Sequence, residues 1–474
     1  MGVPVTRAIR QTAAPWRARL VQPWLVAILF ICWYLLRLPA QWEYDSYGVY
    51  LGSRHVLDWL SGRTQVLSDV GPYPLMQYLS GVSALWAASH GIPINIFWLW
   101  SALNTIGLAG IAAVLYRAAG RTNRPELFWA MLVVILSGPL VAYEPTTFNE
   151  LFAAFLAVAF TDAVTANAAP ILCAILFWLS GITKETAAPL LLVIWLGALC
   201  MRAPQARPRN LAVHVFSLLS AFIITVATNA AFNLLRFHSA WNTQYLTPYF
   251  FVGSLHRRMQ YCIALWLAPN GGVLMFWPTL ALFTAGVLVI GLPRRRITKP
   301  AIIVAIVLGA MTLMLSGWYS PFGWWAWGPR LLLPWLPAAA LLLLKGDPVA
   351  CANWIGRLLT RPRAFIATAA ITCLCALPHI LETTDSDVVE HFFESDRRFP
   401  HGAPVSHVDA QYANNMYLAW QKLPPLLVRP AMEYLTFSRI VPGLAFAAAL
   451  VVLLWKCREE IVYGLLVRKR APSR

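Results

Sequence analysis

The chain has 474 residues, of which 59% are hydrophobic and only 12% are charged. A soluble domain carries about twice this charged fraction, so the composition excludes an ordinary soluble protein. The formal net charge of +17 would favour nucleic acid as a partner in a soluble protein. Here, however, lysine and arginine crowd every second loop between apolar stretches, so we expect no nucleic-acid partner. The eight cysteines include no C-x-x-C pair, which argues against a disulfide framework or a metal knuckle.

The apolar stretches predict the fold. A helix that crosses the bilayer needs about 20 mostly apolar residues, so this length supplies about twelve spans. Lysine and arginine in short loops mark the cytoplasmic side, and they place both termini inside. We therefore predict an all-α polytopic membrane protein in the cytoplasmic membrane of a bacterium, with a core over residues 1–345. The carboxy-terminal spans, residues 346–474, enclose an external cap loop at 379–438.

In chain order, the first span at about 21–38 leads to an external loop over residues 40–93. Within this loop, residues 75–89 are apolar but short and contain Gln77, Ser80 and Ser83. We predict an interfacial helix there, introduced by Pro72 and Pro74. The later spans are expected at about 95–116, 126–142, 150–167, 169–183, 187–201, 211–235, 272–291, 300–317, 331–345, 364–380 and 440–456.

Acidic residues near the outer boundary are candidates for chemistry. Tyr44 and Asp45 follow the first span, where a partly desolvated carboxylate can accept a proton from a hydroxyl. The alternative is an interfacial acid in a turn or helix cap. Asp69 precedes Gly-Pro, a pattern that is also ordinary in turns. Glu144 and Glu150 lie in a short outer loop, where two carboxylates suit a sugar hydroxyl or a metal. The alternative is that Asn149 and Glu150 cap the next helix.

Two basic positions suit an anion. Lys184 interrupts two short apolar runs and either pairs with Glu185 or faces a lipid phosphate. Arg330 follows Gly-Pro and is expected in the first turn of an apolar helix. There it opposes the helix dipole unless it shares an anion with the free N–H groups. Trp324 and Trp327 belong to four tryptophans within ten residues, suited to a sugar or a prenyl chain. The alternative is an aromatic belt with a snorkelling arginine.

Several segments, in order, resemble the GT-C superfamily of integral-membrane glycosyltransferases. They are Glu43-Tyr44-Asp45, Pro72 to Leu75, Gly181 to Thr186, Asn233 to Tyr245, Pro269 to Pro278 and Gly328-Pro329-Arg330. The resemblance implies a polyprenyl-phosphate-sugar donor and an inverting reaction with Asp45 as the base. It also implies that Lys184 and Arg330 bind the donor phosphate on the periplasmic face.

The resemblance further implies an envelope glycan, lipid or protein as acceptor. We assign acceptor binding to Tyr44, Asp69, Glu144, Glu150, Arg236, Trp324 and Trp327. We expect no cofactor, because no paired-acid motif supports a divalent metal and the cap-loop histidines lack zinc spacing. The alternative class is a transporter or flippase for a lipid-linked or anionic solute, for which Asp162 and Asn229 are polar candidates within the spans. A non-catalytic assembly partner is a third possibility.

Overall fold

The computed structural model is all-helical in the residues it describes, which confirms the predicted fold class. These residues are 44–67, 70–92, 94, 96–122, 124–144, 146, 148–202, 208–244, 246, 251–268, 272–291, 299–318, 329–381 and 437–470. The first predicted span and most of the cap loop lie outside them.

The helices of the first half of the chain are α4 (Tyr44–Leu60), α5 (Leu75–Ser89), α6 (Ile96–Thr122), α7 (Pro125–Leu136), the 3-10 helix η1 (Pro139–Tyr143), α8 (Glu150–Thr165), α9 (Pro170–Thr183), α10 (Ala187–Arg202) and α11 (Pro208–Phe237). Those of the second half are α12 (Leu255–Leu267), α13 (Val273–Phe276), α14 (Pro278–Gly291), α15 (Lys299–Ser316), α16 (Leu336–Gly346), α17 (Pro348–Thr360), α18 (Pro362–Leu381) and α22 (Phe437–Arg470).

Apolar length identifies this as a helical membrane protein. Among the described residues, Leu99–Thr122, Leu211–Phe237 and Lys299–Ser316 are long and apolar enough to cross a bilayer. The bent pair α16 and α17 adds a fourth candidate span if it is counted as one. Five further apolar helices are shorter, between 10 and 17 residues. The side of the membrane that each loop faces stays a prediction from the charge pattern.

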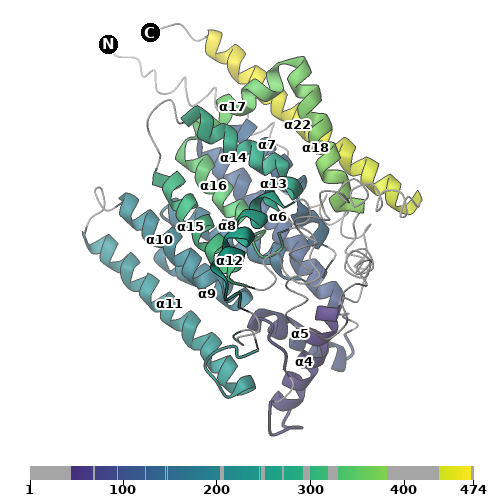
Figure 1. Cartoon of the computed structure of the whole chain (residues 1–474), viewed down its shortest axis with the longest axis vertical. Coiled ribbons are helices and arrows are strands. Elements are labelled where there is room, and N and C mark those ends of the chain that lie inside the picture. The colour runs from purple at the N-terminus through teal and green to yellow at the C-terminus, as the bar shows by residue number, and fades with distance from the viewer. Residues whose placement is uncertain are drawn as a thin grey trace, which may run out of the picture.

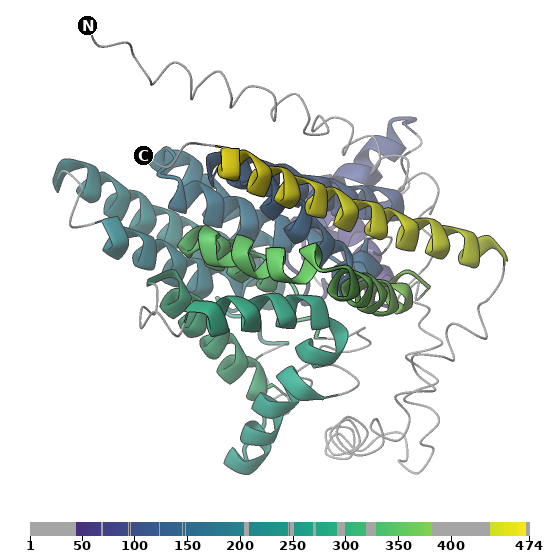
Figure 2. The ribbon, with the colours of Figure 1, turned by 90° about the horizontal axis from the view of Figure 1, so that it is seen from above.

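Helix α8 lies at the centre of the bundle (Figures 1 and 2). It packs against α6, α9, α10 and α16, and the largest hydrophobic cluster surrounds it. A second, smaller cluster forms under α4 and α5 around Val49, Tyr78 and Trp100. Figure 1 shows α4 and α5 at one end of the molecule and α17 at the other.

The bounds of α5, Leu75–Ser89, match the predicted interfacial helix. Other predicted spans are interrupted. The run at 126–142 breaks at Ser137 and Gly138 into α7 and η1, because Pro139 has no N–H for the helical ladder and its ring clashes with the preceding turn. Gly138 itself lies against the indole of Trp277, where a Cβ has no room. The run at 272–291 breaks into α13 and α14 at Trp277, just before a proline that cannot continue the hydrogen-bond ladder.

The region predicted as an inner loop after Lys345 is largely helical. Helix α17 turns away from α16 by 103°, and the Asp347 carboxylate caps its first turn by accepting from the Ala350 N–H. Its alternating polar and apolar sequence suits an interface rather than a crossing helix. The cap at Asp347 thus starts a helix in the segment that the charge pattern only placed between two spans.

Helix α8 carries a buried acid near each end, and each acid pairs with a basic residue of the α16 segment. Glu150 pairs with Arg330, which precedes α16, and Asp162 pairs with Lys345 in the last turn of α16. The two segments therefore run parallel and are joined at both ends. The two acids are about 18 Å apart along the helix axis, at 1.5 Å per residue. We refer to the "Glu150 end" and the "Asp162 end" of the bundle.

Candidate functional site

Two buried cations converge on one carboxylate oxygen at the Glu150 end. Glu150 Oε1 accepts from Lys184 Nζ at 2.7 Å and from Arg330 Nε at 2.9 Å. The Glu150 side chain is 1% exposed, and those of Lys184 and Arg330 are 13% and 14% exposed. The structure thus brings together the two residues that were predicted to hold a donor phosphate. Glu150, predicted to contact the acceptor, is the residue that joins them.

The ends of α8 and α9 place Lys184 beside Glu150. The Asn149 side chain donates to the Thr183 carbonyl at 2.5 Å, which ties the start of α8 to the end of α9. It makes no capping bond to its own helix, so the predicted capping role of Asn149 was wrong. Lys184 is then the first residue after α9, and its side chain reaches the first residue of α8.

Arg330 is held in a hydrogen-bonded turn before α16 rather than in the first turn of that helix. The N–H groups of Leu332 and Leu333 donate to the Pro329 carbonyl, whereas α16 begins at Leu336. The prediction that Arg330 faces the helix dipole was therefore wrong. Its guanidinium instead lies over the Phe148 ring, with Cζ 3.6 Å from the ring centroid, an arrangement that stabilises a cation.

Among the described residues, the cluster has two cations and one carboxylate, whose charges sum to +1. Burial lowers the pKa of Lys184 below its ordinary value, and the Arg330 charge adds to this effect, while Glu150 opposes it. Glu150 Oε2 is buried and accepts no hydrogen bond from the described residues. A buried oxygen left in this state is costly, and a hydroxyl donor would satisfy it.

A small pocket lies next to the cluster, between α5, α6 and the start of α8. Its cavity volume is about 20 Å³. Its walls are mostly apolar with a few amide and hydroxyl groups, and its lining residues are Met76, Gln77, Ser80, Trp100, Leu103, Asn104, Phe148, Asn149 and Phe152. Phe148 is shared by the pocket and by the Arg330 contact, so the pocket and the cationic cluster are adjacent.

Glu144 lies in a buried layer behind this pocket. It is fully buried, and its Oε1 accepts from Thr105 Oγ1 at 2.5 Å. The neighbouring Asn104 amide donates to the carbonyls of Tyr143, Thr146 and Phe148. In this structure Glu144 contacts Thr105 and joins η1 to α6. Its predicted contact with an acceptor stays a prediction. The sequence analysis did not single out Asn104 and Thr105. Adjacent amide and hydroxyl side chains within an apolar run are a sequence signal for buried hydrogen bonds of this kind.

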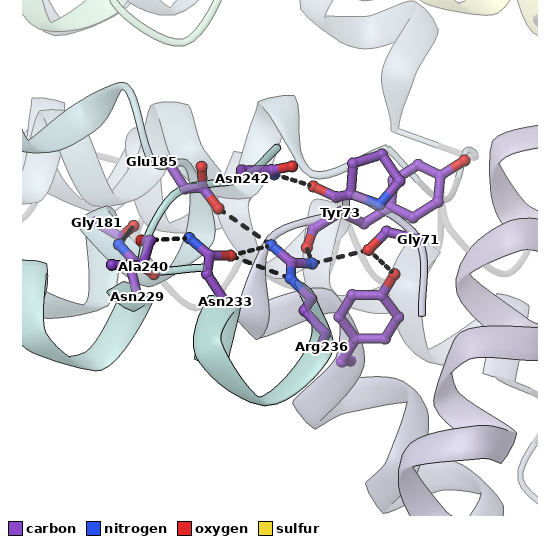
Figure 3. A network of polar contacts seen from close by, with 11 residues as sticks. Gly71, Tyr73, Gly181, Glu185, Asn229, Asn233, Arg236, Ala240 and Asn242 are labelled. Atoms are coloured by element: carbon purple, nitrogen blue, oxygen red, sulfur yellow. Dashed lines mark hydrogen bonds and ion pairs between the residues drawn. The ribbon is translucent and has the colours of Figure 1, made fainter. Parts of the chain in front are cut away.

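Arg236, predicted to bind the acceptor, clamps the loop before α5 (Figure 3). Its Nη1 donates to the carbonyls of Gly71 and Tyr73 at 2.8 and 2.7 Å, and its Nε and Nη2 donate to Asn233 Oδ1 at 3.1 and 2.7 Å. Nη2 also reaches Glu185 Oε1 at 3.4 Å. All five N–H groups of this guanidinium therefore have protein acceptors, which leaves none for a substrate in this state.

The same network decides the pairing of Glu185. This carboxylate pairs with Arg236 and not with Lys184, so the predicted alternative of a neutralising Lys184–Glu185 pair was wrong. Burial raises the pKa of Glu185, although the Arg236 charge opposes the shift. Asn242 also donates to the Pro72 carbonyl at 2.9 Å. The loop before α5 is thus fixed from the side of α11.

The remaining predicted site residues are described in part or not at all. Tyr44 and Asp45 form the start of α4, one turn before Gly48, which lies against the Tyr73 ring. Their side chains lie outside the described part. Asp69, Trp324 and Trp327 also lie outside the described residues. No group of three or more His, Cys, Asp or Glu side chains able to hold a metal ion occurs within the described ranges.

The polar candidates for transport have structural partners. Asp162 lies at the Asp162 end of α8 and pairs with Arg117, Arg121 and Lys345. The Asn229 amide donates to the Gly181 carbonyl at 3.1 Å and joins α11 to α9. Both polar side chains therefore contact protein groups in this structure.

Neither a protein-family model nor a curated protein sequence matches the chain. Among solved structures, the chain is similar to ArnT from Cupriavidus metallidurans bound to undecaprenyl phosphate. The two chains are 14% identical, with a TM-score of 0.46 over 94% of this chain and 78% of that one. This likeness is too distant to assign a function to the chain.

Proposed function

We propose that this protein is a membrane glycosyltransferase that uses a polyprenyl-phosphate sugar as its donor. It transfers the sugar to a hydroxyl of an envelope glycan, lipid or protein on the outer face of the cytoplasmic membrane. The observation that carries the proposal is the meeting of Lys184 and Arg330 on Glu150, beside an apolar pocket. The segments that resemble the GT-C superfamily add to it.

The charge of the cluster suits this donor. A polyprenyl-phosphate sugar is a phosphodiester with one negative charge, which the net charge of +1 balances. When the bond from the anomeric carbon to the phosphate oxygen breaks, a phosphate monoester forms and approaches two negative charges at neutral pH. Lys184 and Arg330 stabilise this developing charge through charge-assisted hydrogen bonds. Such differential stabilisation accelerates the transfer step rather than only tightening donor binding.

The acceptor side of the reaction needs a base. In the proposal, Asp45 takes the proton from the acceptor hydroxyl while its oxygen attacks the anomeric carbon, with inversion. The second carboxylate oxygen of Glu150, which accepts no hydrogen bond from the described residues, accepts from a sugar hydroxyl and so orients the substrate. The apolar walls of the pocket, among them Trp100 and Phe152, contact the first isoprene units of the donor.

The test measures binding of a polyprenyl phosphate, the reaction product, to the purified full chain in detergent. We expect Lys184→Ala and Arg330→Ala each to weaken binding on the order of tenfold, since each removes one charge-assisted contact. Arg54→Gln is the matched control, because Arg54 is an exposed arginine of α4 at the same end. Wild-type affinity in both alanine variants would refute the proposed phosphate site.

Activity is tested separately with a panel of polyprenyl-phosphate sugars, by mass spectrometry of the released polyprenyl phosphate. We expect at least one sugar to be turned over by the wild type. Loss of turnover in Arg330→Ala, with turnover retained in Arg54→Gln, would support the assigned role. Binding of the lipid phosphate without turnover of any donor would contradict an enzyme and favour transport.

A further inference from the structure

A second cationic cluster lies at the Asp162 end, about 18 Å along α8 from the first. The Asp162 Oδ1 atom contacts Arg121 Nη1 at 2.9 Å and Lys345 Nζ at 2.5 Å, and Oδ2 contacts Arg117 Nη2 at 2.6 Å. Lys345 also donates to Thr165 Oγ1 at 2.6 Å. The cluster joins three helices, since its members come from α6, α8 and α16.

The cluster is positively charged and open on one side. Three cations share one carboxylate, so the net charge is +2. Among the described residues, no second carboxylate pairs with Arg117, Arg121 or Lys345. The Asp162 side chain is fully buried, whereas those of Arg117 and Arg121 are 53% and 45% exposed. Each guanidinium thus contacts the buried Asp162 with one nitrogen, while its side chain is about half exposed.

The exposed face of α6 leads from these arginines along the predicted span. Ile106 and Ala113 are exposed, and they precede Arg117 by eleven and four residues, a spacing that places all three on one side of a helix. Leu99–Thr122 is one of the helices apolar enough to cross a membrane. Ile106 and Ala113 therefore form an exposed apolar strip on α6, and this strip ends at the cationic cluster.

We propose that this cluster binds the headgroup of an anionic phospholipid, with its phosphodiester between Arg117 and Arg121. Arginine suits this ligand because its fork can donate two parallel hydrogen bonds to one phosphate. Basic clusters between spanning helices on the cytoplasmic side attract anionic headgroups. The acyl chains lie along the strip marked by Ala113 and Ile106. This site is separate from the proposed donor site and does not depend on the proposed function.

The test measures lipid binding to the delipidated full chain by native mass spectrometry and thermal unfolding. Phosphatidylglycerol is the probe, with phosphatidylcholine and inorganic phosphate as comparison ligands. The variant is Arg117→Gln/Arg121→Gln, which keeps the Lys345–Asp162 pair. The control is Arg361→Gln/Arg363→Gln, which removes two exposed arginines at the start of α18. A third variant, Arg117→Lys/Arg121→Lys, keeps the charge and loses the forked geometry.

We expect phosphatidylglycerol to bind and stabilise the wild type and the control, while phosphatidylcholine and inorganic phosphate do neither. The glutamine variant should bind phosphatidylglycerol at least tenfold more weakly, and the lysine variant should fall between them. An unchanged affinity in the glutamine variant would overturn the proposal. So would an equal loss in the control, which would indicate general attraction to the basic surface. Equal stabilisation by inorganic phosphate would assign the site to a free anion instead.

Discussion

Arg330 Nε lies 2.9 Å from Glu150 Oε1, although 180 residues separate the two along the chain. The same oxygen accepts from Lys184, so a single atom connects three segments. At a buried site, each member of such a group stabilises the others only while all are present. The cluster therefore serves stability and, in the proposed function, binding at once.

The first prediction concerns the balance of charge in this cluster. Glu150→Gln leaves two buried cations without an anion and should lower the free energy of unfolding by roughly 3 kcal/mol. Lys184→Met/Glu150→Gln removes one cation as well and should recover part of this loss. Thermal unfolding in detergent of the single and double variants provides the measurement. If the losses of unfolding free energy in Lys184→Met and Glu150→Gln simply add in the double variant, the two residues are not coupled and their pair contributes little to stability.

The second prediction concerns pH. Burial lowers the pKa of Lys184 below its ordinary value of 10.5, so the folded protein loses this proton before the unfolded chain does. Affinity for a polyprenyl phosphate should fall as the pH rises through the lowered pKa. Over the same window, the unfolded chain binds more protons, so the contribution of Lys184 to stability should increase with pH.

The check is a titration of binding and of unfolding between pH 7 and pH 10.5, the ordinary lysine value. Lys184→Arg is the control, because a guanidinium stays charged throughout. We expect both pH dependences to weaken strongly in that variant. An alkaline loss of binding that persists in Lys184→Arg would assign the titration to a different group.

The third prediction concerns the loop before α5. Arg236→Lys keeps the charge but cannot replace the forked contacts to Gly71, Tyr73 and Asn233. It should speed hydrogen exchange first at the amides around Gly71 and the start of α5, and lower the unfolding temperature. Asn242→Ala removes one contact to Pro72 in the same loop and should have a smaller effect of the same kind. Uniformly faster exchange over the whole chain would show a global loss of stability instead.

The fourth prediction concerns the proposed base. Asp45→Asn should abolish sugar transfer while leaving the affinity for a polyprenyl phosphate within about twofold, since the phosphate contacts belong to Lys184 and Arg330. Asp58→Asn is a matched control on the same helix, because Asp58 pairs only with the exposed Arg63 among the described contacts. Transfer that continues at the wild-type rate in Asp45→Asn would remove Asp45 from the mechanism.

The fifth prediction concerns packing at the break between α7 and η1. A Cβ at Gly138 would overlap the Trp277 indole, whose Nε1 is fixed by the Val134 carbonyl at 2.7 Å. Gly138→Ala should therefore destabilise the protein by about 1–3 kcal/mol. Gly120→Ala is the control, because nothing lies within 4 Å of its Cβ position and alanine favours a helix. Equal effects of the two substitutions would show that the contact with Trp277 does not limit the space at Gly138.

Local pattern was sufficient for several elements. The start of α5 follows from the two prolines that precede it. The proximity of Lys184 and Arg330 follows from their placement at predicted outer boundaries. The pattern did not reveal Glu150 as the shared partner, because that contact depends on how α8, α9 and the α16 segment pack. It also missed the break at Gly138, although Pro139 signals it locally, and it did not reveal the contact of Gly138 with Trp277, which depends on tertiary packing.

Arg236 shows a different limit of prediction from sequence, and its role in acceptor binding stays a prediction. A lone arginine at an outer boundary suits substrate binding and structural clamping equally well from sequence alone. Its partners include the backbone carbonyls of Gly71 and Tyr73. Every residue has a backbone carbonyl, so the sequence does not show which ones accept a hydrogen bond from Arg236. The roles of Asp69, Trp324 and Trp327 stay predictions.

The paired attachments of α8 and α16 restrict how the bundle can move. A slide of one helix past the other by a single turn, about 5.4 Å, would break the Glu150–Arg330 and Asp162–Lys345 contacts together. Tilting about one attachment breaks only the other. The two helices thus behave as one rigid unit across the bundle.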